Sequence, residues 1–303
     1  MAVPIARSFD IDALSRNVDA EGHGAQLDSA VLQAGSQNVV LETDDLIVRF
    51  PRDESVSVDW EANLLRFVQG RTRFETPEVL WLGVETRCMA YRKIAGTQFD
   101  RRAYVAETAA TRSAFADSLA ESLVEVQDAL AAATDAGAEL PVDDFSKFYR
   151  PLREGLSAFP AEAQAPMSDL LDEYEATFLS GERRVPVAMH NDFHFGNLVL
   201  DGPLGRVIGL WDFSCAAFGV AAWDLRYFEG DLASPWEVPV HAPGEHLDLL
   251  HRVVRSYGEL RGTSIDARAC VVANRVEALF DLSVTGAEDA LRAWALWDAT
   301  KAG

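Results

Sequence analysis

The sequence predicts an α+β fold, in which an antiparallel sheet comes first and a mainly helical region follows. Short runs rich in β-branched residues occupy the N-terminal part, whereas helical periodicity dominates after Pro141 and again from Pro243 to the end. The 303 residues, 49% of them hydrophobic, exceed the size that a single core usually serves. We therefore expect an N-terminal lobe of residues 1–94, a C-terminal lobe of residues 97–303, and a hinge at about 89–96.

The sheet is predicted from runs of apolar and β-branched residues that are separated by turn residues such as Asp44 and Asp45. Closely spaced runs of this kind are typical of antiparallel pairing. The runs that we expect to form strands are Asn38–Glu42, Leu46–Phe50, Val79–Gly83 and Cys88–Ile94.

Helices are predicted where apolar residues recur at helical spacing. One covers Val58–Gln69 and ends at Gly70, and a second, rich in alanine and leucine, covers Ala103–Ala138. Two short apolar runs, Val187–Met189 and Val207–Trp211, flank a histidine-rich segment and are expected to be strands. That segment therefore lies in a loop between strands.

The charge of the chain is strongly acidic, with 48 Asp and Glu against 27 Lys and Arg and a net charge of -21. Such a field disfavours nucleic acid and anionic membranes as partners. It suits a cationic small molecule, although solubility alone also explains it. No apolar run approaches the length of a bilayer-spanning helix, so we expect a cytoplasmic protein, either a monomer or a homodimer. The three cysteines are widely spaced, which indicates packing residues rather than disulfides or a zinc site.

The most informative segment is HNDFHFGN, which begins at His190 and in which Asp192 precedes Asn197 by five residues. This is the spacing of the catalytic loop of kinases, in which the aspartate accepts a proton from the substrate hydroxyl and the asparagine binds magnesium. Asp212, fifteen residues further on, ends an apolar run and can supply a second oxygen ligand. Each residue alone fits a turn or a cap, but the ordered set predicts Mg²⁺-dependent phosphoryl transfer.

Three segments together resemble the aminoglycoside phosphotransferases and their relatives, which include macrolide kinases and choline-kinase-like enzymes. Members of this family carry a loop like His-Gly-Asp-Leu-His-x-Gly-Asn, then Ile-Asp-Trp or Ile-Asp-Phe, then Gly-Asp-Pro-Ala-x-Asp-Leu-Ala. Here the segments read HNDFHFGN, LWDFS and FGVAAWDL. The resemblance covers nearly the whole chain and implies a protein-kinase-like fold with two lobes.

Roles for single residues follow from this resemblance. It implies that Asp192 is the catalytic base, that Asn197 and Asp212 bind Mg²⁺, and that His190 supports the loop through hydrogen bonds. It also implies a structural role for Asp224, which would cap or anchor the helix after the metal-binding strand. The neighbouring histidine of the loop, at position 194, either braces the loop or fills space.

The N-terminal part fits the same family with one departure. Gly35 and Ser36 lie where these enzymes carry the loop over the nucleotide phosphates. Kinases usually place a lysine on the following strand, but the only lysines here are at positions 93, 147 and 301, and the strand carries Arg49. Arginine can also grip phosphate oxygens, and its expected partner is Glu61. Taken without the rest of the motif set, Glu61 is more simply interpreted as a solvated helix residue.

The resemblance places the hinge at the strand that ends near Gly96. Backbone groups of Ala90, Tyr91 and Arg92 would then bind the purine of ATP or GTP, while the side chain of Tyr91 is a packing residue by default.

The acceptor is the least constrained part of the prediction. Carboxylates of the C-terminal lobe could hold a cationic acceptor, and aromatic residues beside them could hold a quaternary ammonium group, contact a macrolide, or belong to the core. The first candidate set consists of Glu229, Asp231, Glu237 and Trp236. Glu277 and Asp281, which lie one helical turn apart, are a second set, for which a solvated helix face is the simpler interpretation.

Three functions remain compatible with the sequence. One is a kinase for an aminoglycoside-type antibiotic, which would confer resistance. Another is a kinase for a macrolide or another hydroxylated metabolite such as choline or homoserine. The third is a nucleotide-binding pseudokinase, which the intact Asp192, Asn197 and Asp212 oppose and which Arg49 leaves open.

Overall fold

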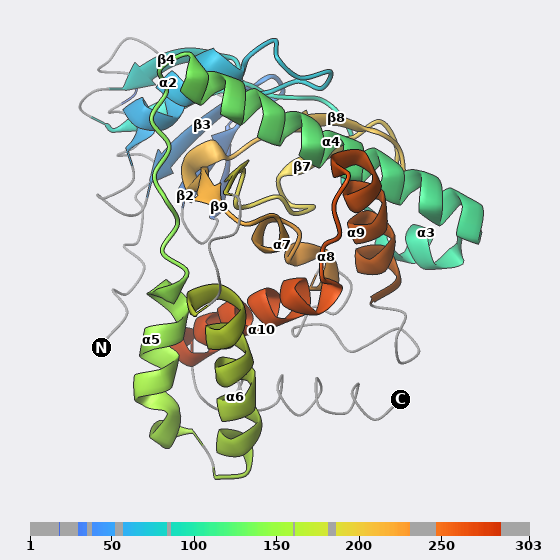
Figure 1. Cartoon of the computed structure of the whole chain (residues 1–303). Coiled ribbons are helices and arrows are strands. Elements are labelled where there is room, and N and C mark those ends of the chain that lie inside the picture. Colours follow the sequence, from blue (N-terminus) through green and yellow to red (C-terminus); the bar gives the residue numbers. More distant parts are fainter. Residues whose placement is uncertain are drawn as a thin grey trace.

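The structure, a computed structural model, consists of a sheet that is followed by a mainly helical region (Figure 1). It describes residues 18, 30–34, 38–51, 57–83, 86–159, 161–180, 186–230 and 247–285. None of the helices within these ranges is long and apolar enough to cross a membrane.

The sheet has five antiparallel strands in the order β1-β2-β3-β5-β4. All four predicted strands are present, and an additional strand, β1, precedes the predicted phosphate-loop residues Gly35 and Ser36 in sequence. It escaped prediction because it is a short edge strand whose Val31 is 62% exposed, so it lacks a buried apolar pattern. The strands are β1 Val31–Ala34, β2 Asn38–Glu42, β3 Leu46–Pro51, β4 Val79–Gly83 and β5 Cys88–Arg92.

Helix α2, Val58–Val68, crosses between strands β3 and β4 and confirms the predicted helix. The hydroxyl of Ser57 caps it by accepting a hydrogen bond from the backbone N–H of Trp60 at 3.2 Å. Gly70 follows the helix with a φ of 73°, a conformation that glycine adopts readily and that lets the chain turn away.

The predicted helix over Ala103–Ala138 is two helices, α3 Arg101–Ala106 and α4 Ala109–Asp135. The break occurs at Thr108, which has an extended backbone. Its hydroxyl caps α4 by accepting a hydrogen bond from the backbone N–H of Thr111 at 3.2 Å. The alanine-rich composition concealed this start signal. Helix α4 then runs through the middle of the molecule (Figure 1), and its buried face packs in the central core.

Two small antiparallel ribbons lie beside α4 and carry the histidine-rich segment. The predicted strands at 187–189 and 207–211 do not pair with each other, because each pairs with a further strand that we had not predicted. One ribbon consists of β6 Val187–Met189 and β9 Ala217–Gly219, and the other of β7 Leu198–Leu200 and β8 Val207–Leu210.

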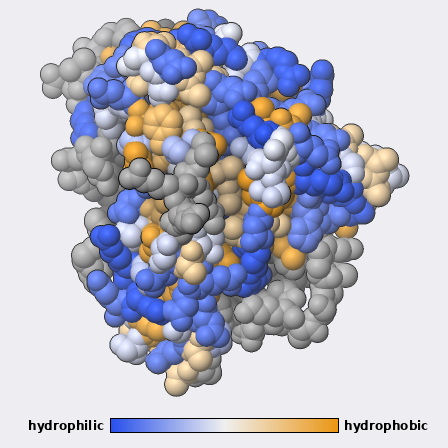
Figure 2. Space-filling model, viewed as in Figure 1, coloured by the Kyte–Doolittle hydropathy of each residue, from blue (hydrophilic) through white to orange (hydrophobic). Residues whose placement is uncertain are grey.

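The remaining elements are helical and mostly lie below the ribbons in Figure 1. They are α5 Ser146–Gly155, η2 Leu156–Ala158, α6 Ala161–Tyr174, the π-helix η3 Glu175–Leu179, η4 Phe213–Cys215, α7 Ala221–Asp224, α8 Tyr227–Gly230, α9 Asp248–Arg261 and α10 Ala267–Thr285. On the face shown in Figure 2, hydrophilic residues dominate the rim and hydrophobic residues gather near the centre.

The ribbon β7–β8 joins the sheet region to the helical region. Glu75, which follows α2, exchanges backbone hydrogen bonds with Ile208 and Leu210 at 2.9 and 3.0 Å. On the other side, Thr97 pairs with Leu200. Gly96 permits this approach, since a Cβ there would lie 2.4 Å from Val199. The ribbon is therefore fixed against the α2–β4 loop of the sheet region and against the segment that leads from β5 into the helical region.

Candidate functional site

The pairing of β7 with β8 brings the two predicted magnesium ligands together. Leu198 lies opposite Leu210, so the residues at the same end of each strand are neighbours. The backbone N–H of Trp211 accordingly donates to the carbonyl of Asn197 at 3.1 Å. Asn197 and Asp212 therefore meet at one end of the ribbon, although fourteen residues separate them in sequence.

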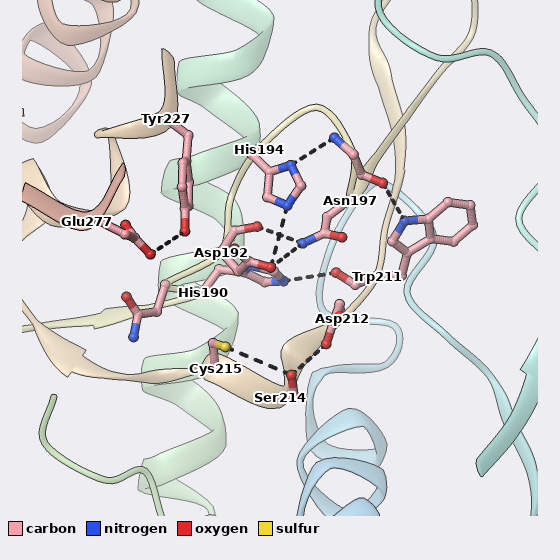
Figure 3. Close-up of polar contacts among 12 residues, drawn as sticks. His190, Asp192, His194, Asn197, Trp211, Asp212, Ser214, Cys215, Tyr227 and Glu277 are labelled. Atoms are coloured by element: carbon pink, nitrogen blue, oxygen red, sulfur yellow. Dashed lines mark hydrogen bonds and ion pairs between the residues drawn. The ribbon is translucent and has the colours of Figure 1, made fainter. Parts of the chain in front are cut away.

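The carboxylate of Asp192 is held mainly through one of its oxygens (Figure 3). Asn197 donates from Nδ2 to Oδ2 at 2.7 Å and to the carbonyl of Asp192 at 2.9 Å. Nε2 of His194 lies 3.5 Å from the same Oδ2. Burial raises the pKa of Asp192, but the hydrogen bond and charge of His194 outweigh it, so the pKa falls below its usual value. Asp192 is thus an ionised acceptor.

His194 contacts Asp192, which favours the bracing role among the alternatives left open by the sequence. Its Nδ1 accepts a hydrogen bond from the backbone N–H of Gly196 at 3.0 Å. This bond leaves the ring proton of the neutral imidazole on Nε2, the atom that faces Asp192.

Asp212 follows β8 at the end of the ribbon where Asn197 precedes β7. Its backbone is left-handed, with a φ of 60°, a conformation that non-glycine residues adopt mostly at functional sites. Oδ1 accepts from Ser214 Oγ at 2.6 Å and from Arg49 Nη1 at 2.5 Å. Because Asn197 uses its amide nitrogen on Asp192, its amide oxygen is left for a ligand.

These donors fit Mg²⁺. An amide oxygen and a carboxylate are hard ligands, and Mg²⁺ commonly takes one or two protein oxygens together with phosphate oxygens and water. Within the described residues, no group of three or more His, Cys, Asp or Glu side chains forms a metal cage. The site thus suits a magnesium ion that arrives with a nucleotide.

Arg49 and Glu61 form a buried ion pair behind Asp212. Arg49 is 2% exposed and Glu61 is 1% exposed. The other oxygen of Glu61 accepts from the backbone N–H of Phe213 at 2.9 Å. The solvated-helix interpretation of Glu61 is therefore wrong. Glu61 ties α2 to Arg49 and to the segment that carries Asp212.

His190 is fully buried, and its Nε2 lies 3.1 Å from the carbonyl of Trp211. Burial lowers the pKa of His190 below 6.5, so the neutral ring donates this bond. Phe213 packs edge-on against the ring at 4.7 Å between centroids. The ring therefore links the start of the catalytic loop to the end of β8.

The lowered pKa of His190 predicts a pH-dependent stability. The unfolded chain binds a proton at an ordinary pKa near 6.5 while the folded chain does not, so the free energy of unfolding should fall as pH drops below about 6.5, by at most about 1.4 kcal/mol per pH unit from this residue. Urea midpoints of wild type and His190→Gln at pH 7.5 and 5.5 test this. We expect the difference between the two proteins to shrink or reverse at pH 5.5, and an unchanged difference would contradict the assignment.

Asp224 is structural, as predicted, but it anchors a different segment. It is fully buried near the end of α7 and accepts from the backbone N–H groups of His190 at 3.3 Å and Asn191 at 2.7 Å. Gln127 of α4 donates to it at 3.0 Å. The predicted capping of its own helix is wrong because α7 begins after Val220, and Asp224 holds the catalytic loop instead.

The backbone of Ala90, Tyr91 and Arg92 lies inside the sheet. These residues belong to β5, which pairs with β3 on one side and β4 on the other. Burial also raises the pKa of the Tyr91 hydroxyl to about 12, which agrees with a packing role. The sheet therefore uses the backbone that we had expected to bind a purine, and the connection to the helical region begins at Lys93.

Glu229 is not available to an acceptor. It is 1% exposed and accepts from Asn274 at 2.8 Å and from Arg275 at 3.1 Å. The sequence could not show this, because its partners lie about 45 residues away on α10. The other predicted acceptor residues and the two phosphate-loop residues lie outside the described ranges. They are Asp231, Trp236, Glu237, Gly35 and Ser36.

In the second acidic set only Glu277 departs from the solvated face considered above, because Asp281 is exposed. Glu277 is half-buried and pairs with Arg226 and with the hydroxyl of Tyr227. The pKa of Asp281, one turn away, is raised to about 6 by reduced hydration and by repulsion from Glu277. The sequence analysis did not identify Arg226 as a residue of the site. The only sequence feature that could have indicated it is its position two residues after Asp224.

Comparison with known proteins places this chain among phosphotransferases. Residues 30–261 match the family described as "Phosphotransferase enzyme family". A mutant of aminoglycoside 2'-phosphotransferase-IIIa in complex with GDP has a similar fold, with a TM-score of 0.73, 17% identity, and coverage of 97% of this chain and 98% of that chain. No curated protein matches the sequence.

Macrolide enzymes share the fold as well. The apoenzyme of macrolide 2'-phosphotransferase MphH from Brachybacterium faecium has a TM-score of 0.58, 17% identity, and coverage of 94% of this chain and 98% of that chain. The GDP and kanamycin complex of APH(2")-IIIa has a TM-score of 0.69 at 16% identity and covers 96% of this chain and 98% of that chain. At these identities the likeness concerns the fold.

Proposed function

This chain belongs to the phosphotransferase enzyme family, and we propose on that basis that it transfers the γ-phosphoryl group of ATP or GTP to a hydroxyl group of a small molecule. One observation carries the proposal. The fold gathers Asp192, Asn197 and Asp212, which lie up to twenty residues apart, into a single constellation of oxygen donors beside a buried Arg49.

The proposed mechanism starts at Asp192. Oδ2 is engaged by Asn197 and His194, so Oδ1 is the oxygen that would accept the proton of the acceptor hydroxyl. The hydroxyl oxygen then attacks the γ-phosphorus, and the bond from phosphorus to the β-γ bridging oxygen breaks, which releases ADP or GDP. Asn197 and Asp212 would hold Mg²⁺, which neutralises charge on the phosphates when it is bound.

The nucleotide site is proposed to lie between the sheet and the ribbon β7–β8. Arg49 on β3 would contact the phosphates while Glu61 fixes its guanidinium. We propose residues 1–94 as the nucleotide-binding lobe and residues 97–303 as the acceptor lobe. Because residues up to Arg92 belong to β5, we propose residues 93–96 as the hinge instead of about 89–96. Support comes from similar structures, which are complexes with GDP, ATP and ADP.

For the acceptor we propose an aminoglycoside-type polycation. The net charge of -21 favours a cation, and the exposed Asp281 adds a carboxylate on α10. Similar structures are complexes with kanamycin, streptomycin and gentamicin. A macrolide is the second candidate, since a macrolide enzyme shares the fold.

The test is a coupled assay of ADP and GDP release with Mg²⁺ over a panel of aminoglycosides, macrolides, choline and homoserine. We expect turnover with at least one aminoglycoside and identification of a phosphorylated product by mass spectrometry. Turnover with a macrolide alone would reassign the acceptor. Tight binding of Mg²⁺-nucleotide without turnover of any acceptor would instead indicate a pseudokinase.

Asp212→Asn should abolish the magnesium dependence of nucleotide binding. The variant removes a charged oxygen ligand but keeps the size of the side chain. Calorimetric titration of ATP and GTP with and without Mg²⁺ should show a large metal effect in wild type and little in the variant. Asp201→Asn, at the far end of the same ribbon, is the matched control and should behave as wild type. A full metal effect in Asp212→Asn would remove Asp212 from the ligand set.

A further inference from the structure

Arg226 is a buried cation next to the catalytic loop. It is 2% exposed and lies in the turn between α7 and α8. Its guanidinium lies over the ring of Trp223 at 4.7 Å and over the ring of Tyr227 at 4.1 Å. Two aromatic rings thus pack against the guanidinium, which stabilises a desolvated arginine and limits its movement.

The edges of the guanidinium join two distant parts of the chain. Nη2 donates to the carbonyl of Asn191 at 2.9 Å, and Nη1 lies 3.5 Å from Asn191 Oδ1. On the other side, Arg226 forms a bidentate pair with Glu277 of α10, and Tyr227 donates to the same carboxylate at 2.9 Å. The catalytic loop is therefore linked to α10 through one side chain.

The Asn191 carbonyl is a sensitive point, because it belongs to the peptide group that leads into Asp192. Asn191 has a φ of 67°, and a left-handed asparagine persists only where its surroundings hold it. Asp224 holds its N–H and Arg226 holds its carbonyl. The two contacts fix the peptide planes on both sides of Asn191, and so they set the position of Asp192.

A second contact leads from the same cluster to Asp192. The ring of Tyr227 packs edge-on against His194 with centroids 5.2 Å apart (Figure 3). His194 in turn lies beside Asp192 Oδ2. Displacement of the Arg226 cluster would therefore act on Asp192 from two directions, through the backbone and through His194.

We propose that Arg226 is a positioning residue for phosphoryl transfer, which sets the place of Asp192 through the carbonyl of Asn191 and is itself held by Glu277 of α10. The inference rests on the proposed function in that it assigns the catalytic step to Asp192. Because α10 also carries Asp281, the helix that would contact a cationic acceptor is the one that fixes the base.

The chain offers a matched control. Arg275 and Glu229 form another buried arginine-glutamate pair that involves α10, at 6% and 1% exposure, and it joins α10 to α8 rather than to the catalytic loop. Replacing a member of either pair removes a buried charge contact and destabilises the fold. Only the Arg226 pair should affect catalysis beyond that.

The experiment compares Arg226→Lys and Glu277→Gln with Arg275→Lys and Glu229→Gln in the full-length protein. Lysine keeps the charge but cannot bridge Asn191 and Glu277 in one plane. We expect Arg226→Lys to lower kcat about 100-fold, as a misplaced catalytic group does, with KM for the nucleotide unchanged within about twofold, given that the nucleotide site is elsewhere. The control variants should lose thermal stability to a similar extent while keeping kcat within about threefold.

Hydrogen exchange of the loop 189–197, measured by mass spectrometry, adds a readout that needs no activity. Exchange at this loop should rise in Arg226→Lys and Glu277→Gln and not in the controls. Unchanged loop exchange, or an equal loss of kcat in all four variants, would overturn the positioning role. If wild type phosphorylates no acceptor, the proposed function fails while the exchange comparison still decides this inference. If Arg226→Lys does not fold, Glu277→Gln carries the same comparison.

Discussion

Asp192→Asn is expected to lower kcat by about 10³-fold while nucleotide binding stays close to that of wild type. A general base contributes about 10²–10⁴-fold, and an amide oxygen is too weak a base to take the acceptor proton. The change keeps an oxygen for Asn197, so the loop should hold its shape. Steady-state kinetics with the best acceptor of the panel, together with calorimetric nucleotide titration, give both quantities.

Two comparisons make this prediction specific. Asp44→Asn alters an exposed turn residue and should leave kcat unchanged. Asp192→Asn should also keep the thermal stability of wild type within a few degrees, which separates loss of chemistry from loss of fold. Activity within about tenfold of wild type would refute Asp192 as the base, because the loss of a general base lowers the rate by more than that.

Arg49→Met is expected to destabilise the protein by about 3–5 kcal/mol, the usual effect of leaving a buried charge without its partner. Glu61 is 1% exposed, so water cannot replace the guanidinium. Urea unfolding followed by fluorescence measures this change. Replacing both residues, as Arg49→Met with Glu61→Met, should recover a large part of the loss, since the double variant leaves no unpaired charge in the core.

Arg49→Lys tests whether arginine here does the work of the usual kinase lysine. We expect phosphoryl transfer within about tenfold of wild type, because a lysine on β3 can still reach Glu61 and the phosphates. A loss as large as that of Arg49→Met would show that the planar guanidinium itself is required. Full activity of Arg49→Met would instead remove this residue from the nucleotide site.

Local signals in the sequence predicted much of the fold. Helix α2 and strands β2, β4 and β6 match their predicted bounds closely, because a cap or turn residue and a clear apolar pattern mark each of them. Strand β1 was missed because an edge strand buries little. The break at Thr108 was missed because alanine-rich sequence reads as helix on both sides of it.

By itself, the sequence determined the reaction class, and it predicted the constellation, because Asp192, Asn197 and Asp212 are recognisable from their types and spacing. Only the tertiary structure decided what surrounds them. In the fold, Glu61 is buried in a pair with Arg49, and Glu229 is buried in a pair with Arg275. Asp224 holds the predicted catalytic loop through the backbone N–H of Asn191. The local sequence around a helix carboxylate is the same whether the side chain faces water or a buried guanidinium. Its partner is remote in sequence and comes close only in the fold.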